Sequence, residues 1–298
     1  MKIIAGVATL GRPEAVGQAV TDLARQTRKP DRVIVSATRM QDTAPAAFAA
    51  SPLTIETLFG PPGATRQRNA ILDVAGDADV ILFLDDDFVM APDYLSRLEQ
   101  IFARDPGLAV VTGDVLADGI GSAGISHRDA VAIIDKAPPG TDDMVPVNNG
   151  YGCNMAFRVG PIRDHHPRFD ESLPLYGWLE DVDFSRRVAA HGDCVKAMAL
   201  RGVHLGTKGG RTSGKRLGYS QIVNPVYLVG RRTLKPLHAG RLMARNVAAN
   251  AAMSLRPEPW IDRRGRLLGN ILACCDLLLL RIDPLRVLRI VGRHDRRS

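Results

Sequence analysis

The stretch Val80-Ile81-Leu82-Phe83-Leu84-Asp85-Asp86-Asp87 decides the fold of this chain. Its five consecutive apolar residues predict a strand that is buried on both faces. The strand ends in three carboxylates, at the edge where open α/β sheets place their ligands. Side chains alternate along an extended chain, so Asp85 and Asp87 are expected on one side and Asp86 on the other. Paired carboxylates repel each other unless a cation lies between them, which predicts a Mg²⁺ or Mn²⁺ site, with a solvated acidic turn as the alternative.

The segments before this strand alternate between strand and helix patterns. Short apolar runs bounded by turn residues predict strands at 3–8, 32–36 and 53–59. Helical spacing of apolar residues predicts helices after Pro13, over 64–75 and after Pro92. Strand alternating with helix is typical of parallel βαβ winding. The sequence therefore predicts an α/β fold, Rossmann-like, with a mostly parallel central sheet flanked by helices.

The pattern changes after residue 105. We expect a strand at 108–111, an irregular Gly/Pro-broken segment at 119–145, a helix from about 179 to 190, and a strand at 195–206 that contains His204. The remainder reads as helical, over 221–228, 239–254 and 266–281. The predicted organisation is a catalytic domain over 1–220, with a ligand-binding half at 1–118 and a second half at 119–220, followed by a basic helical region at 221–298.

Composition narrows the class of protein. The chain has 298 residues, of which 45% are hydrophobic and 5% aromatic, so it can bury a large core but offers few rings for base stacking. We expect no nucleic-acid partner. Four cysteines without CxxC spacing indicate a reduced, cytoplasmic compartment, with Cys274 and Cys275 as core thiols. The first residues read as a strand rather than an export signal, because Arg12-Pro13 interrupts the apolar run.

Two polar stretches add candidate chemistry. Residues 148–158 combine glycines, which permit close backbone approach to a ligand, with asparagine donors and acceptors; a polar turn entering a strand is the alternative. Residues 176–187 place acids in the first turn of a helix and arginines later, as the helix dipole favours. A simple capping cluster explains the acids equally well.

These motifs together resemble the GT-A-fold glycosyltransferases of family 2, which are inverting and use nucleotide-diphosphate sugars. The match covers roughly residues 1–230 in the right order, and its elements are Thr9…Arg12-Pro13, Gln26-Thr27…Pro30, Val33-Ile34-Val35-Ser36, Arg66-Gln67-Arg68-Asn69, Phe83-Leu84-Asp85-Asp86-Asp87, Gly152-Cys153-Asn154-Met155 and Trp178-Leu179-Glu180-Asp181-Val182-Asp183. The resemblance implies a GT-A fold with a helical C-terminal extension.

The resemblance also implies roles for individual residues. Asp85 and Asp87 look like the pair that holds a divalent metal on the donor diphosphate, with Asp87 the more direct ligand. His204 stands where some members supply a further metal or diphosphate contact, with a satisfied strand-end histidine as the alternative. Asp181, with its neighbour Glu180, looks like the catalytic base that deprotonates the acceptor hydroxyl. The nucleotide-sugar site would include Thr9, Arg12, Ser36, Arg66, Asn69 and Asp86, and the acceptor site Gly152, Asn154 and Trp178.

The sequence defines the donor nucleotide less closely than it defines the type of reaction. Many relatives carry an Asp soon after the second strand, whereas here Ser36 is followed by Ala37-Thr38-Arg39 and the next Asp is Asp42. UDP is the expected nucleotide, with dTDP or GDP open. Residues 209–216 fit GxxxxGK, but Arg216 stands where a P-loop needs Ser or Thr, which argues against a P-loop. One interpretation is a basic loop that covers the diphosphate with the cations Lys208, Arg211 and Lys215. The other interpretation is an exposed linker.

Charge and hydrophobicity suggest a partner for the C-terminal third. Residues 1–200 carry a net charge of −8 and residues 201–298 carry +15. The apolar run 267–280 is shorter than the roughly 20 residues of a spanning helix and is flanked by arginines. An interfacial helix on an anionic membrane surface is one interpretation, and packing on the catalytic domain or a dimer contact is the other.

The expected activity is therefore metal-dependent transfer of a sugar to a hydroxyl of a glycan or lipid-linked oligosaccharide, in cell-surface or exo-polysaccharide synthesis. The expected location is cytoplasmic, on the inner face of the membrane if the tail binds lipid. A nucleotidyltransferase is the first alternative, but Gly11-Arg12-Pro13 is not its Gly-rich basic signature. A catalytically silent binding protein is the second, although it would have no need to keep Asp87 and Asp181.

Overall fold

The computed structural model describes residues 1–209 and 212–290. Within these residues the chain forms two compact units. Unit 1 comprises residues 1–62, 66–169 and 184–209, and unit 2 comprises residues 63–65, 170–183 and 212–290.

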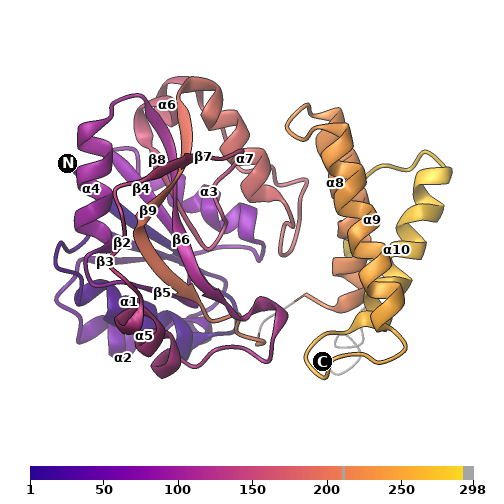
Figure 1. Ribbon diagram of the computed structural model, residues 1–298, viewed down its shortest axis with the longest axis horizontal. Helices are drawn as coiled ribbons and strands as arrows, with labels where there is room; N and C mark the ends of the chain where they lie inside the picture. The colour runs from indigo at the N-terminus through magenta and orange to yellow at the C-terminus, as the bar shows by residue number, and fades with distance from the viewer. Residues whose placement is uncertain (210–211, 291–298) are drawn as a thin grey trace. The chain divides into compact units, whose positions relative to one another are not determined.

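Unit 1 is built on one mixed sheet, in the order β3-β2-β1-β4-β8-β6-β9-β5, with β7 paired to β9 (Figure 1). The strands are β1 (Ile3–Ala8), β2 (Arg32–Ala37), β3 (Ile55–Phe59), β4 (Val80–Asp85), β5 (Phe88–Met90), β6 (Leu108–Asp118), β7 (Met144–Pro146), β8 (Asn154–Arg158) and β9 (Asp193–His204). The first half is parallel, because β1 pairs with β2 and β4, and β2 with β3, in that sense. In the second half β8 runs antiparallel to both of its neighbours, whereas β6 and β9 are parallel. The predicted mostly parallel α/β sheet is confirmed.

Two apolar clusters cover the two faces of this sheet. Helices α1 (Pro13–Ala24) and α4 (Tyr94–Arg104) contribute to one, and α3 (Ala64–Val74), α6 (Val159–His165) and α7 (Glu180–Val188) to the other. Leu82 and Ile81 on β4 point to opposite clusters, which is why the strand is apolar at every position. Burial on both faces fixes the register of β4, and its carboxyl end therefore places the acidic triplet beside the ends of β1 and β9.

Several local expectations from the sequence were wrong. The segment 119–145, predicted to be irregular, contains helix α5 (His127–Lys136), which buries Ala130 and Ile134. The loop before β3 contains a short helix, α2 (Pro45–Ala49). β6 extends to Asp118, seven residues beyond the predicted strand end at 111, because it pairs with β9 along most of its length. Cys274 and Cys275, predicted as core thiols, are exposed.

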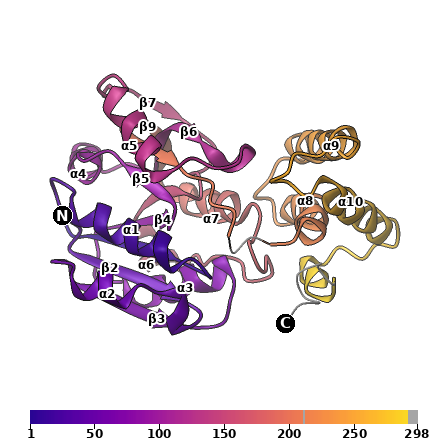
Figure 2. The same ribbon diagram turned by 90° about the horizontal axis from the view of Figure 1, so that it is seen from below.

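Unit 2 contains three long helices that contact one another, as Figure 2 shows. They are α8 (Gly214–Gly230), α9 (Pro236–Met253) and α10 (Arg263–Leu278), and a 3₁₀ segment at Pro284–Arg289 follows. α8 and α10 approach closely because glycines meet there: a Cβ on Gly269 would lie 2.1 Å from the Lys215 carbonyl oxygen. No helix in the described part of the chain is both long and apolar enough to cross a membrane.

Candidate active site

The acidic triplet lies where β4 ends and the chain turns into β5. Asp86 and Asp87 are almost fully buried, and Asp85 is partly exposed. The Thr9 hydroxyl donates to Asp86 at 2.7 Å. The Arg12 guanidinium lies 2.9 Å from Asp86 and 3.5 Å from Asp87. Asp86 therefore faces Thr9 and Arg12, both predicted site residues at the end of β1, and all three come together in the structure.

Asp87 faces a histidine. Nε2 of His204, at the end of β9, lies 3.4 Å from Asp87, while its Nδ1 lies 3.0 Å from Asp118. Asp87 also accepts a hydrogen bond from the backbone N–H of Thr207 at 2.7 Å. One ligand atom from each of Asp85, Asp87 and His204 lies within 4.8 Å of the other two. The structure thus gathers the three residues that the sequence proposes as metal ligands, from two strand ends.

Electrostatics explains why this group holds together. Burial raises the pKa of Asp87, but the hydrogen bond and charge of His204 outweigh it and hold that pKa well below its usual range. Burial lowers the pKa of His204, but the Asp118 and Asp87 carboxylates raise it to about 10. Burial, opposed by Arg12, raises the pKa of Asp86 to about 7. His204 is consequently an imidazolium near neutral pH, and its charge occupies the place of a cation among the carboxylates.

The donor set is suitable for a divalent metal. Carboxylate oxygens are the ligands that Mg²⁺ and Mn²⁺ prefer, and imidazole nitrogen suits several transition metals. Asp118 would stay hydrogen-bonded to Nδ1 of His204, leaving Nε2 to face the metal, as second-sphere carboxylates commonly arrange. The contact of Asp118 with His204 was not predicted from the sequence, because Asp118 stands beyond the predicted end of its strand.

The residues predicted to bind the nucleotide sugar differ in their exposure. Ser36 is buried, and its carbonyl accepts hydrogen bonds from the Thr9 N–H and the Gln67 side chain. Gln67 also donates to the Thr9 carbonyl at 2.7 Å, so it joins the ends of β1 and β2. Arg66 is exposed. Asn69 is buried, and its amide makes two hydrogen bonds of 2.9 Å with the Phe169 backbone.

Arg68 is a site residue that sequence analysis quoted in a motif without assigning a role. Its buried guanidinium donates to Asp85 at 3.0 Å and to the Gly152 carbonyl at 3.0 Å. The predicted acceptor residue Gly152 is thus tied to the acidic triplet through its backbone. Asn154, also predicted to bind acceptor, is fully buried in β8 and accepts from the Thr112 hydroxyl at 2.7 Å.

Trp178, Glu180 and Asp181 belong to unit 2. The carbonyl of Trp178 accepts from the Asn224 amide on α8 at 2.8 Å. Glu180 is buried at the first position of α7, and Asp181 is partly exposed. Leu179, immediately before them, has a positive φ of 73°, a conformation that costs energy for a branched side chain and is concentrated at functional sites.

The basic loop has three predicted cations. The Lys208 ammonium donates to the carbonyls of Gly119 and Ile120 at 3.0 and 3.1 Å, which ties this loop to the segment after β6. Lys215 lies half-buried in the first turn of α8. Arg211 lies outside the described residues.

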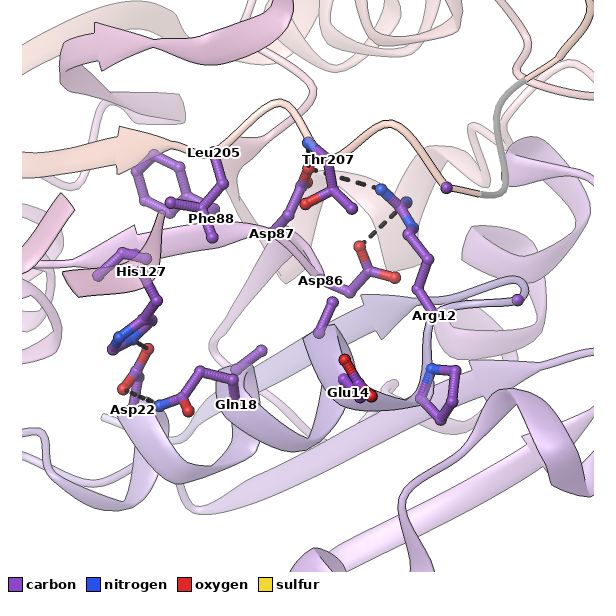
Figure 3. A pocket seen from close by; sticks show the side chains of 16 residues that line it. Arg12, Glu14, Gln18, Asp22, Asp86, Asp87, Phe88, His127, Leu205 and Thr207 are labelled. Carbon is purple, nitrogen blue, oxygen red and sulfur yellow. Dashed lines mark hydrogen bonds and ion pairs between the residues drawn. The ribbon is translucent and has the colours of Figure 1, made fainter. Parts of the chain in front are cut away.

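A cleft of about 570 Å³ opens beside the triplet (Figure 3). Arg12, Asp86 and Asp87 lie at one end, and Asp22 with His127 of α5 lies at the other. His127 contacts Asp22 at 2.7 Å, and Gln18 donates to the same carboxylate at 3.0 Å. The volume is within the range of about 300–1,000 Å³ typical of small-molecule sites.

The sheet topology and the acidic end of β4 define a GT-A-type α/β protein. The family model for glycosyl transferase family 2 matches residues 5–165, more than half of the chain. The chain belongs to this family, and the predicted family and fold class are confirmed. No curated protein sequence matches it significantly.

Solved structures share the fold. The chain is 16% identical to Staphylococcus aureus TarS residues 1–349 in complex with UDP-GlcNAc, at a TM-score of 0.58, with 98% of this chain and 84% of that chain covered. It is 16% identical to the mannosyltransferase PcManGT from Pyrobaculum calidifontis in complex with GDP-Man and Mn²⁺, at a TM-score of 0.54, with 96% and 85% covered. These likenesses support the GT-A architecture.

Proposed function

We propose that this glycosyltransferase is an inverting, metal-dependent enzyme that moves a sugar from a nucleotide-diphosphate sugar to a hydroxyl of a glycan or lipid-linked oligosaccharide. The observation that carries the proposal is the Asp85–Asp87–His204 group in a chain of this family. Such a group sits at the carboxyl edge of the sheet, where α/β proteins bind ligands, and beside a cleft large enough for a substrate.

Asp85, Asp87 and His204 would hold Mg²⁺ or Mn²⁺, which stabilises the charge that develops on the leaving nucleotide diphosphate. Arg12 would bind the same developing charge, because it already lies against Asp86 and Asp87 at the head of the cleft. UDP is the proposed nucleotide, with dTDP and GDP as alternatives. Two fold neighbours are described as bound to UDP-GlcNAc and to GDP-Man, which supports nucleotide-sugar binding as a class.

Asp181 is the proposed general base, with Glu180 beside it. A sugar hydroxyl is a weak nucleophile, so a carboxylate that takes its proton contributes about 10²–10⁴ in rate. Asp181 is the more accessible of the two acids, since Glu180 is only 6% exposed. The acceptor oxygen attacks the anomeric carbon as the bond to the diphosphate breaks, which inverts the configuration without an enzyme nucleophile.

The remaining site assignments are proposals of the same kind. Thr9, Ser36, Arg66 and Asp86 would surround the nucleotide sugar, Trp178 and the Gly152 backbone the acceptor, and Lys208, Arg211 and Lys215 the diphosphate. We also propose synthesis of cell-surface or exo-polysaccharide at a cytoplasmic location, with the protein peripheral on the inner membrane face where it meets a lipid-linked acceptor.

A panel of nucleotide sugars tests the proposal. Purified protein should hydrolyse or transfer from one of them with Mn²⁺, and EDTA should stop the reaction. Titration calorimetry with UDP and Mn²⁺ should show binding that Asp87→Ala abolishes. The matched control is Asp164→Ala, which removes a carboxylate from a side chain that is 62% exposed and pairs with the neighbouring Arg163. Equal metal-dependent binding by Asp87→Ala and wild type would refute the metal assignment.

A further inference from the structure

Helix α10 presents an apolar face outward. The exposed residues recur at helical spacing and continue past the end of the helix, and we call them the α10 apolar face: Leu268, Ile271, Leu272, Cys275, Leu278, Leu279 and Leu280. Leu278 and Leu280 are each 85% exposed. Ile282, Leu285 and Leu288 in the following segment are exposed as well. Contiguous apolar surface of this kind marks an interaction site.

The opposite side of α10 is fixed in the core of unit 2, so the orientation of the helix is well determined within the unit. Gly269, Asn270 and Ala273 are buried there. The Asn270 amide donates to the Gly218 carbonyl of α8 at 2.7 Å. Asp276 accepts from the Tyr219 hydroxyl at 2.8 Å and from Arg286 at 2.9 Å. The helix therefore buries its amide and carboxylate and exposes its leucines, the reverse of a helix that faces water.

Charge identifies the occupant of this face. Residues 263–290 contain six arginines and two aspartates, and Asp276 is already paired with Arg286. Arg264, Arg281 and Arg289 are exposed beside the leucines. A second copy of the chain would bring the same positive charge against itself, which is unfavourable. Anionic lipid headgroups attract such arginines, and the acyl region accepts the leucines.

We propose that the α10 apolar face binds the surface of an anionic bilayer, with Leu278–Leu280 inserted and Arg281 and Arg289 at the headgroups. With 16 residues, α10 is too short to span, since about 20 are needed, so the contact is interfacial. The proposal specifies the membrane contact named in the proposed function, and its test is independent of transferase activity.

Flotation of the full-length protein with vesicles provides the test. Phosphatidylcholine vesicles containing phosphatidylglycerol should bind it, pure phosphatidylcholine vesicles should bind it less, and added salt should weaken the binding. Leu278→Ser combined with Leu280→Ser should lower the partition coefficient about tenfold per leucine. Arg281→Gln should lower it about fivefold on anionic vesicles only. Leu255→Ser is the matched control, because Leu255 is 83% exposed but lies between α9 and α10, and it should change nothing.

Three results would overturn the proposal. The first is no flotation with anionic vesicles, and the second is an equal loss in Leu255→Ser. The third is a wild-type dimer, seen by size-exclusion chromatography with light scattering, that the double leucine variant converts to a monomer, because a second copy would then cover the face. Hydrolysis of a nucleotide sugar should be unchanged in the double variant. That measurement distinguishes a failure of the proposed membrane contact from a failure of the proposed transferase activity.

Discussion

Metal binding at the Asp85–Asp87–His204 group should release a proton, and its affinity should therefore rise with pH. In the metal-free protein the two carboxylates hold His204 as an imidazolium with a pKa of about 10. An imidazolium cannot ligate a metal. Below that pKa, each unit by which the pH falls should lower the apparent affinity about tenfold. From pH 8 to pH 6 the dissociation constant for Mn²⁺ should rise about a hundredfold.

The assay uses Mn²⁺ alone, because a nucleotide diphosphate titrates in the same range. Titration calorimetry at pH 6, 7 and 8 in two buffers of different ionisation enthalpy gives both the affinity and the number of protons released. The wild type should release about one proton per metal. His204→Asn loses both a ligand and its titrating proton, so it should bind more weakly, and its affinity should change less with pH than that of the wild type.

Two outcomes would refute the reasoning. A wild-type affinity that does not change with pH would show that His204 stays outside the coordination sphere and serves only as a counter-charge. An equal pH dependence in His204→Asn would place the released proton on another group.

Three further predictions concern single residues. Asp118→Asn should weaken Mn²⁺ binding about 10–100-fold with an unchanged circular dichroism spectrum, because Asp118 orients the ligand His204; unchanged binding would contradict this. Asp181→Asn should keep donor affinity while turnover falls about 10²–10⁴-fold, and normal turnover with an inactive Glu180→Gln would show that the neighbouring acid is the base. Gln67→Leu removes donors from two buried carbonyls and should lower the free energy of unfolding in urea by about 1–3 kcal/mol, and no loss would mean that water replaces them.

The elements around β4 were predictable because each carries its own local signal. β1, β2 and α3 lie within one residue of the expected ranges, and α1 begins at Pro13 as expected. Their apolar residues serve two faces of one sheet, so strand and helix periods are both regular. The pairing of Asp85 with Asp87 was predictable for a related reason: they stand at the end of such a strand, where side-chain direction follows from alternation, whereas His204 was expected from the family resemblance.

Helix α5 was missed although its signal was present. Ser126 caps it by accepting from the Asp129 N–H, and a Ser followed three residues later by an acid is a helix-start pattern. The glycines and prolines that flank the segment outweighed that pattern in the prediction. The consequence is functional, because α5 places His127 in the wall of the cleft.

Arg68 and Gln67 could not have been assigned from local pattern. Both lie on α3. Arg68 donates to residues 85 and 152, and Gln67 donates to residues 9 and 36. Such contacts depend on how β1, β2, β4 and β8 are ordered in the sheet, which spacing along the chain does not reveal. The burial of the Asn154 side chain in β8 depends on the same strand order.

The acidic triplet differs from a solvated acidic turn because each carboxylate has its own cationic partner from a distant element. Asp85 is paired with Arg68, Asp86 with Arg12, and Asp87 with His204. Arginine keeps its proton at any pH a protein tolerates, whereas histidine can lose one. Of these three partners, only His204 can therefore lose its proton, and with it its charge, when a competing cation binds. A divalent metal bound there would replace the His204 proton beside Asp87, while Arg68 and Arg12 would remain the partners of Asp85 and Asp86.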